Sequence, residues 1–180
     1  DHFPRHCETN GDEAMRNMIR LGIGRAEAHR MTGESSVTLY TSLMLLFGSY
    51  FDEDPMYPWA RRALQASAPA TESARSGSLY DAGVAFWERM GGADNRNFVV
   101  AISRLRRTSA NEAGASLESE GPHFLERIFP EKAHLLGAAG LMAVLVSSQE
   151  TSARHGLDRP LDRAVCAALA FMLGCRFADD

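Results

Sequence analysis

Three acidic side chains follow an apolar run in the first third of the chain. Asp52, Glu53 and Asp54 come shortly after residues 43–47, which read Leu-Met-Leu-Leu-Phe. Together with His29, the carboxylates of Asp52 and Asp54 could bind a metal ion, because carboxylate and imidazole groups suit manganese, iron or zinc. The chemistry that this set allows is metal-dependent hydrolysis, which we keep as the alternative function.

A structural role accounts for the same residues and is the interpretation that we favour. Asp54 precedes Pro55, a pair that favours a turn, and aspartate side chains accept hydrogen bonds from nearby backbone amides. His29 is expected at the C-terminus of a helix, where the helix dipole favours an imidazolium. We therefore expect a non-enzymatic protein with no catalytic residues, no bound metal and no cofactor.

Composition narrows the classes of partner. The chain has 180 residues, of which 45% are hydrophobic, so it can form one domain or two small ones. Its formal net charge of −4 argues against nucleic acid as a partner. No apolar run reaches the roughly 18 residues that a membrane helix needs. Eighteen of the nineteen basic residues are arginine, and Lys132 is the single lysine.

The cysteines and the first residue bear on the compartment. Cys166 and Cys175 are nine positions apart, so on one helix they would face opposite sides and could not bond to each other. With an odd count of three and no Cys-x-x-Cys pair, we expect thiols in a reducing cytoplasm. The first residue is Asp1 and not methionine, so the sequence leaves open whether a signal peptide preceded it.

Apolar residues recur at spacings of three and four along most of the chain, which predicts helices. The chain lacks a convincing alternating pattern of the kind that strands show, so we expect an all-α multi-helix bundle. Residues 66–78 and 108–121 are rich in serine, glycine and alanine and are expected to be loops. The helices are expected at residues 13–30, 32–50, 58–64, 79–90, 94–107, 122–129, 131–154 and 160–176.

The chain also contains a repeat with an offset of 126 residues. Over 53 positions aligned without gaps there are eight identities, among them His29 with His155 and Asp54 with Asp180. Chance would give roughly three. We therefore predict an internally duplicated helical unit. The first unit spans residues 1–107, a loop or linker spans 108–121, and a truncated second copy spans 122–180. The second copy stops where the first continues, so we expect the protein to extend past Asp180.

One sequence pattern resembles that of a known family. It comprises a helix ending in His29, a capped turn, a long apolar helix and then Phe-Asp-x-Asp-Pro-x-x-Pro-Trp-Ala at residues 51–60. This pattern is similar to that of an uncharacterised family of helical bacterial proteins often encoded beside type VI secretion components and effector adaptors. The resemblance implies an accessory role in secretion, as an adaptor, chaperone or immunity protein, and it carries over no catalytic residues.

The acidic turn and the short helix after it are the expected binding surface. Aromatic and arginine side chains anchor protein interfaces more often than other types do. The partner is expected to be a protein, such as a secreted effector or its adaptor, and neither a nucleic acid nor a membrane. An alternative is that Trp59 packs the short helix onto the core. The expected partner-binding residues are Asp52, Asp54, Tyr57, Trp59, Arg61 and Arg62.

Overall fold

A computed structural model describes residues 8–9, 11–65 and 71–179. Within these ranges every regular element is helical, which confirms the all-α prediction. None of the described helices is both long and apolar enough to cross a membrane. The α-helices are α2 (Asp12–Ala28), α3 (Glu34–Phe47), α4 (Pro58–Gln65), α5 (Glu72–Gly91), α6 (Arg96–Arg107), α7 (Ala110–Glu120), α8 (Pro122–Ile128), α9 (Pro130–Arg154) and α10 (Pro160–Leu173), with short 3₁₀ helices η1 (Ala93–Asn95) and η2 (Phe177–Asp179).

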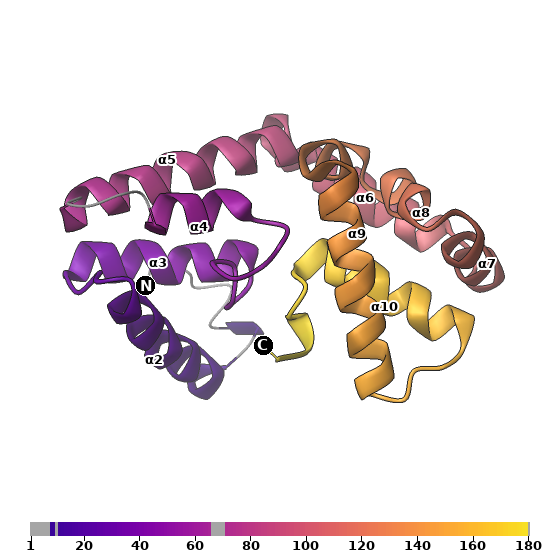
Figure 1. Ribbon diagram of the computed structural model, residues 1–180, viewed down its shortest axis with the longest axis horizontal. Coiled ribbons are helices and arrows are strands. Elements are labelled where there is room, and N and C mark those ends of the chain that lie inside the picture. The colour runs from indigo at the N-terminus through magenta and orange to yellow at the C-terminus, as the bar shows by residue number, and fades with distance from the viewer. Residues whose placement is uncertain (1–7, 10, 66–70, 180) are drawn as a thin grey trace.

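The helices form two halves that lie side by side (Figure 1). Helices α2 to α5 make up the first half, and α6 to α10 make up the second. After α10 the chain returns toward the first half, so that its last described residues lie between the two. A single cluster of buried hydrophobic residues includes members from both halves. The two halves therefore share a core.

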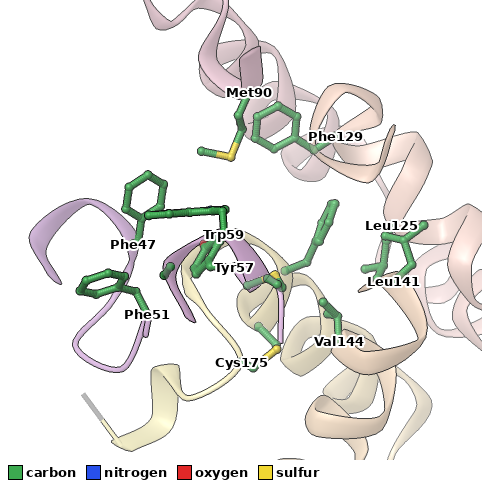
Figure 2. Packing of buried hydrophobic residues seen from close by; sticks show 14 of the residues in the cluster. Phe47, Phe51, Tyr57, Trp59, Met90, Leu125, Phe129, Leu141, Val144 and Cys175 are labelled. Carbon is green, nitrogen blue, oxygen red and sulfur yellow. The ribbon is translucent and has the colours of Figure 1, made fainter. Parts of the chain in front are cut away.

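The first half is organised around Phe47, at the end of α3. Its ring centroid lies 5.1 Å from that of Tyr57 and 5.2 Å from that of Trp59, both at edge-on angles. Edge-on contacts of this kind add about 0.5–1.5 kcal/mol beyond the burial of area. Figure 2 shows Phe47, Phe51, Tyr57 and Trp59 gathered near one another. Helix α4 thus turns its aromatic residue inward, against α3.

Two predicted loops contain helix. Residues 108–121 were expected to be a loop, but α7 occupies most of them. The hydroxyl of Ser109 caps this helix by accepting a hydrogen bond from the N–H of Glu112. Gly114 allows α10 to pack closely, because a Cβ there would lie 2.9 Å from Pro160. Small residues whose composition suggested a loop therefore lie in a helix here, and they allow that helix to pack closely against α10.

The second correction concerns residues 66–78. Residues 66–70 lie outside the described residues, but α5 already begins at Glu72, seven residues before the expected helix. The Thr71 side chain caps it through a hydrogen bond from the N–H of Ala74. Ser-Ala-Arg-Ser-Gly-Ser then continues as helix because this segment packs across α3, where the hydroxyl of Ser76 donates a hydrogen bond to that of Ser36 at 2.8 Å. Tertiary contacts outweigh the weak helix propensity of serine and glycine here.

The element bounds follow the predicted offset of 126 residues. Helix α10 has the bounds of α3 shifted by 126, and α9 ends 126 residues after α2. Gly48 and Gly174 end α3 and α10 at positive φ values of 96° and 129°. Gly11, which precedes α2, and Gly137, where α9 bends, also share positive φ values of 80° and 64°. The two segments match in secondary structure, and their common origin stays a prediction.

We predict that Trp59→Ala lowers the free energy of unfolding by about 3–5 kcal/mol, because it empties a large buried volume beside Phe47. Trp59 is 8% exposed. Chemical denaturation followed by circular dichroism measures the effect. The exposed neighbour Arg61 provides the matched control, and Arg61→Ala is expected to change stability by less than about 0.5 kcal/mol. A loss below about 1 kcal/mol for Trp59→Ala would contradict this packing.

Candidate functional site

The turns that follow α3 and α10 meet between the two halves, and we call this contact the junction (residues 48–54 and 174–179). The guanidinium of Arg176 lies 3.8 Å from the centre of the Tyr50 ring. Its Nη1 also lies 3.1 Å from Oε2 of Glu53. An arginine stacked on an aromatic ring and paired with a carboxylate holds the two turns together at their exposed rim.

Asp52 lies at the first-half side of the junction, with both carboxylate oxygens occupied. Oδ1 accepts a hydrogen bond from Nη2 of Arg25 at 2.6 Å, and Oδ2 lies 2.8 Å from Nε2 of His29. The Asp52 side chain is 1% exposed. Arg25 lies in the last turn of α2 and His29 follows that helix. Asp52 therefore ties the end of α2 to the turn that follows α3.

The surroundings of Asp52 keep it ionised. Burial alone would raise its pKa, but hydrogen bonds from His29 and Arg25 and the charge of Arg25 outweigh burial and lower the pKa from 3.8 to about 2. Burial and the negative charge of Asp52 raise the pKa of the neighbouring Tyr40 hydroxyl well above its usual range. The cluster is thus a fixed ion pair beside a neutral phenol.

Asp54 lies at the centre of the junction. Its Oδ1 accepts a hydrogen bond from the N–H of Met56 at 2.8 Å, and its Oδ2 accepts one from the N–H of Cys175 at 2.6 Å. Gly174 permits this approach, because a Cβ there would lie 3.3 Å from Oδ2. Burial raises the pKa of Asp54, although the two backbone hydrogen bonds oppose that effect. The Asp54 carboxylate thus stabilises its own turn and also binds the turn that follows α10.

Lys132 lies on α9 close to Asp54 and is 1% exposed. Its Nζ lies 3.3 Å from the hydroxyl of Tyr57 and 3.5 Å from the carbonyl oxygen of Met172. It also lies 5.5 Å from the ring centres of Tyr57 and Phe171. Burial lowers the pKa of Lys132 to about 8, while the negative charge of Asp54 acts in the opposite direction. The chain's only lysine is therefore enclosed between the halves.

The geometry does not support the metal-dependent hydrolase. His29 and Asp52 contact each other, but the oxygens of Asp54 are directed to backbone amides. In the described part of the chain, no group of three or more histidine, cysteine, aspartate or glutamate residues is placed to hold a metal ion. At the offset of 126 residues Ala178 stands at the place of Asp52, and Asp180 lies outside the described residues.

The six expected binding residues do not form one exposed surface. Asp52 and Asp54 are each 5% exposed, Tyr57 is 2% exposed, and Trp59 is buried as described above. Of the six, only Arg61 and Arg62 are exposed. The alternative that Trp59 packs its short helix onto the core agrees with this placement.

Two arginines lie over an apolar groove between the halves, which we call the arginine groove. It lies between α4, α5 and α9 and has a volume of about 490 Å³. Trp59, Phe86 and Leu136 contribute to its apolar lining, and Arg62 and Arg89 add positive charge. Its lining includes no acidic residue, and neither arginine has an ion-pair partner within the described ranges. Of the six residues that were expected to bind a partner, only Trp59 and Arg62 line this groove.

Sequence reasoning missed three residues of the site: Lys132 and Cys175 in the second half, and Arg89 in the first half. Lys132 was noted only as the single lysine, and that rarity was the one available signal for it. Arg89 lies in the last turn of α5, where an arginine interacts favourably with the helix dipole. Such an arginine is common, so the sequence does not mark Arg89 as a binding residue. Cys175 contributes a backbone N–H to Asp54, and no sequence pattern marks such a donor.

Comparisons with protein-family models, with curated proteins and with solved structures find no match to this chain. The interpretation of the site therefore rests on its own geometry.

We predict that Asp52 makes stability depend on acid pH. Because folding lowers its pKa to about 2, the ionised group contributes stability that is present above about pH 4 and is lost as the pH falls toward 2. The contribution is about 2 kcal/mol, since one pKa unit corresponds to about 1.4 kcal/mol. Denaturation with urea between pH 2 and 6 should show this loss of stability in the wild type and not in Asp52→Asn.

Asp81→Asn is the control for this experiment, because Asp81 is an exposed aspartate without an ion-pair partner in the described residues, and this variant is expected to keep the wild-type profile. Asp54, whose raised pKa contributes in the opposite direction, is common to all three proteins and cancels in the difference. Equal pH dependence in Asp52→Asn and the wild type would contradict the prediction.

Proposed function

We propose that the protein is a non-enzymatic accessory protein that binds an acidic, partly apolar segment of another protein in the arginine groove. The observation that carries this proposal is the pair Arg62 and Arg89, which lie without ion-pair partners in the described structure over an apolar lining. An apolar surface with convergent charges, built from two halves of a fold, is the usual form of a binding site. The carboxylates of Asp52 and Asp54 are engaged in contacts within the protein, so binding is the better-supported activity.

The chemistry of the groove favours a segment of defined character. Arginine and tryptophan are the residues that most often anchor protein interfaces, and the groove combines Arg62 with the edge of Trp59. Two guanidinium groups attract carboxylates, which they can bind with two parallel hydrogen bonds. The apolar lining favours leucine- or phenylalanine-like side chains between those carboxylates. The proposed occupant is therefore an acidic amphipathic segment.

The biological setting of this role is also a proposal. The Phe-Asp-x-Asp-Pro-x-x-Pro-Trp-Ala pattern supports a place in bacterial secretion, as an adaptor, chaperone or immunity protein for a secreted effector. A cytoplasmic site of action is supported by Cys166 and Cys175, which are free and buried.

We predict that charge reversal in the groove abolishes the binding of acidic amphipathic peptides. Peptides of about 20 residues are selected by phage display on the wild-type protein, and their affinities are measured by fluorescence anisotropy. The double variant Arg62→Glu/Arg89→Glu should weaken the selected acidic peptides at least about tenfold, because each guanidinium–carboxylate contact contributes about 1.5–3 kcal/mol.

Arg61→Glu is the matched control, because Arg61 neighbours Arg62 in the chain but does not line the groove. This variant should retain affinity within about twofold. Selection of no acidic peptide, or equal loss in Arg61→Glu and in the double variant, would contradict the proposal. Binding of small apolar carboxylic acids with no binding of peptides would instead assign the groove to a small molecule and contradict it as well.

A further inference from the structure

A cavity between three helices of the second half contains polar groups that belong neither to the junction nor to the arginine groove. It has a volume of about 200 Å³ and lies between α7, α9 and α10. Two serines on consecutive turns of α9, Ser148 and Ser152, line it, and we call it the serine cavity. Leu117 and Leu145 supply apolar surface from α7 and α9. Apolar side chains combined with a few polar groups are typical of a small-molecule site.

The hydroxyl of Ser152 is buried in this cavity without a partner. Ser152 is 3% exposed, and its Oγ makes no hydrogen bond within the described ranges. Buried polar side-chain atoms in proteins nearly always have a partner, which is a protein group, an ordered water or a ligand. Leaving such a group unpaired costs free energy. The Ser152 hydroxyl is therefore free to bind a polar group that enters the cavity.

Arg163 lines the same cavity from α10 and also has an unused donor. Its Nη2 donates a hydrogen bond to Oε1 of Glu118 at 2.6 Å, but its Nε is buried and has no acceptor in the described part of the chain. Guanidinium nitrogens only donate hydrogen bonds. Two different helices thus each bring an unpaired polar group to one cavity. A ligand oxygen is the acceptor that Nε of Arg163 lacks.

Ser148 imposes the opposite requirement on a ligand. Its hydroxyl donates a hydrogen bond to the carbonyl oxygen of Leu145 at 2.9 Å. Because a serine hydroxyl has one hydrogen to donate, Oγ of Ser148 can only accept a hydrogen bond from a ligand. The matching ligand group therefore carries an acceptor and a donor side by side, as a carboxamide does. The side-chain amide of Gln149, which also lines the cavity, can pair with either.

The charges and the size of the cavity define the ligand further. Glu118 and Arg163 pair with each other, and no other charged residue of the described chain lines the cavity. A carboxylate that approached Arg163 would also approach Glu118, so repulsion would offset attraction and a neutral ligand is favoured. A cavity of about 150 Å³ holds one benzene molecule, which scales to a ligand of about eight non-hydrogen atoms here.

We propose that the serine cavity binds a small neutral carboxamide with a short apolar arm. The carbonyl oxygen of the ligand accepts hydrogen bonds from Ser152 and Arg163, and its N–H donates one to Ser148. The arm packs against Leu117 and Leu145. Because α7, α9 and α10 all contact the ligand, its binding stabilises the folded protein. The cavity shares no lining residue with the arginine groove, so this proposal stands independently of the function proposed for that groove.

The probe is isocaproamide, titrated into the isotopically labelled full chain and followed by backbone amide shifts in two-dimensional NMR. We expect saturable shifts in the parts of α7, α9 and α10 that surround the cavity, and a raised melting temperature at saturating ligand. Two analogues of the same shape test the ligand class. Methyl isoamyl ketone, which lacks the N–H donor, should bind at least about threefold more weakly. Isocaproate, which is charged, should bind at least about tenfold more weakly.

Two protein variants test the site itself. Ser152→Ala should bind isocaproamide at least about threefold more weakly and should melt at a temperature no lower than the wild type, because the hydroxyl it removes has no partner in the free protein. Arg163→Lys keeps the charge beside Glu118 but removes the Nε donor, and it should weaken binding to a similar extent. Ser119→Ala is the matched control, because the Ser119 hydroxyl donates to Ala115 of its own helix and does not line the cavity. This control should keep the wild-type affinity.

Several results would overturn the proposal. The first is the absence of saturable shifts around the cavity, and the second is equal affinity of the wild type and both cavity variants for isocaproamide. Binding of either analogue as tight as that of isocaproamide would overturn the assigned ligand class. A clear loss of stability in Ser152→Ala would show that the hydroxyl already has a partner within the protein, and the argument from an unpaired group would then fail.

Discussion

The carboxylate of Asp54 is the interaction on which the arrangement of the two halves depends. It accepts one hydrogen bond from its own turn, at Met56, and one from the opposite turn, at Cys175. Both donors are backbone N–H groups, which would be costly to bury without an acceptor. The acidic turn therefore has a structural explanation, because Asp54 lies where the turns that follow α3 and α10 meet. The arginine groove depends on the same contact, since its lining comes from both halves.

This arrangement buries ionisable groups, which costs free energy, and it engages them in hydrogen bonds within the protein. Lys132 and Asp54 are both buried, and a buried polar or charged group is costly unless hydrogen bonds compensate for the lost water. What their hydrogen bonds do specify is geometry, because misplacing either side chain leaves a buried polar group without a partner. We infer that the junction fixes one relative placement of the halves. Binding is then left to the exposed surfaces on either side of it.

The sequence predicted the helices well where apolar residues recur strongly, as in α3 and α10. It failed at α7 and at the start of α5, where serine, glycine and alanine resemble a loop and only packing against α10 or α3 makes them helical. The expectation that Asp54 accepts a hydrogen bond from its own turn agrees with the structure, whereas Asp52 and Asp54, also expected in the binding surface, are buried. The second partner of Asp54, at Cys175, is a backbone N–H 121 residues away, which no local pattern reveals. Trp59 illustrates the same limit. An aromatic residue beside arginines looks like an interface anchor, and only the fold shows that α4 turns the tryptophan inward and Arg62 outward.

The most direct test of the account is the rate at which Lys132 reacts with an acylating reagent at a pH well above its pKa of about 8, where the amine is neutral in wild type and variants, followed at that residue by peptide mass spectrometry. Lys132 is the only lysine, so its modification reports opening of the junction without interference from other lysine side chains. If Asp54 closes the junction, Asp54→Asn should react about tenfold faster than the wild type, because the amide leaves one backbone N–H facing another donor, a cost of about 1–3 kcal/mol. Asp52→Asn, which breaks contacts within the first half only, should react at the wild-type rate. Equal rates in Asp54→Asn and the wild type, with both proteins folded, would contradict the central claim.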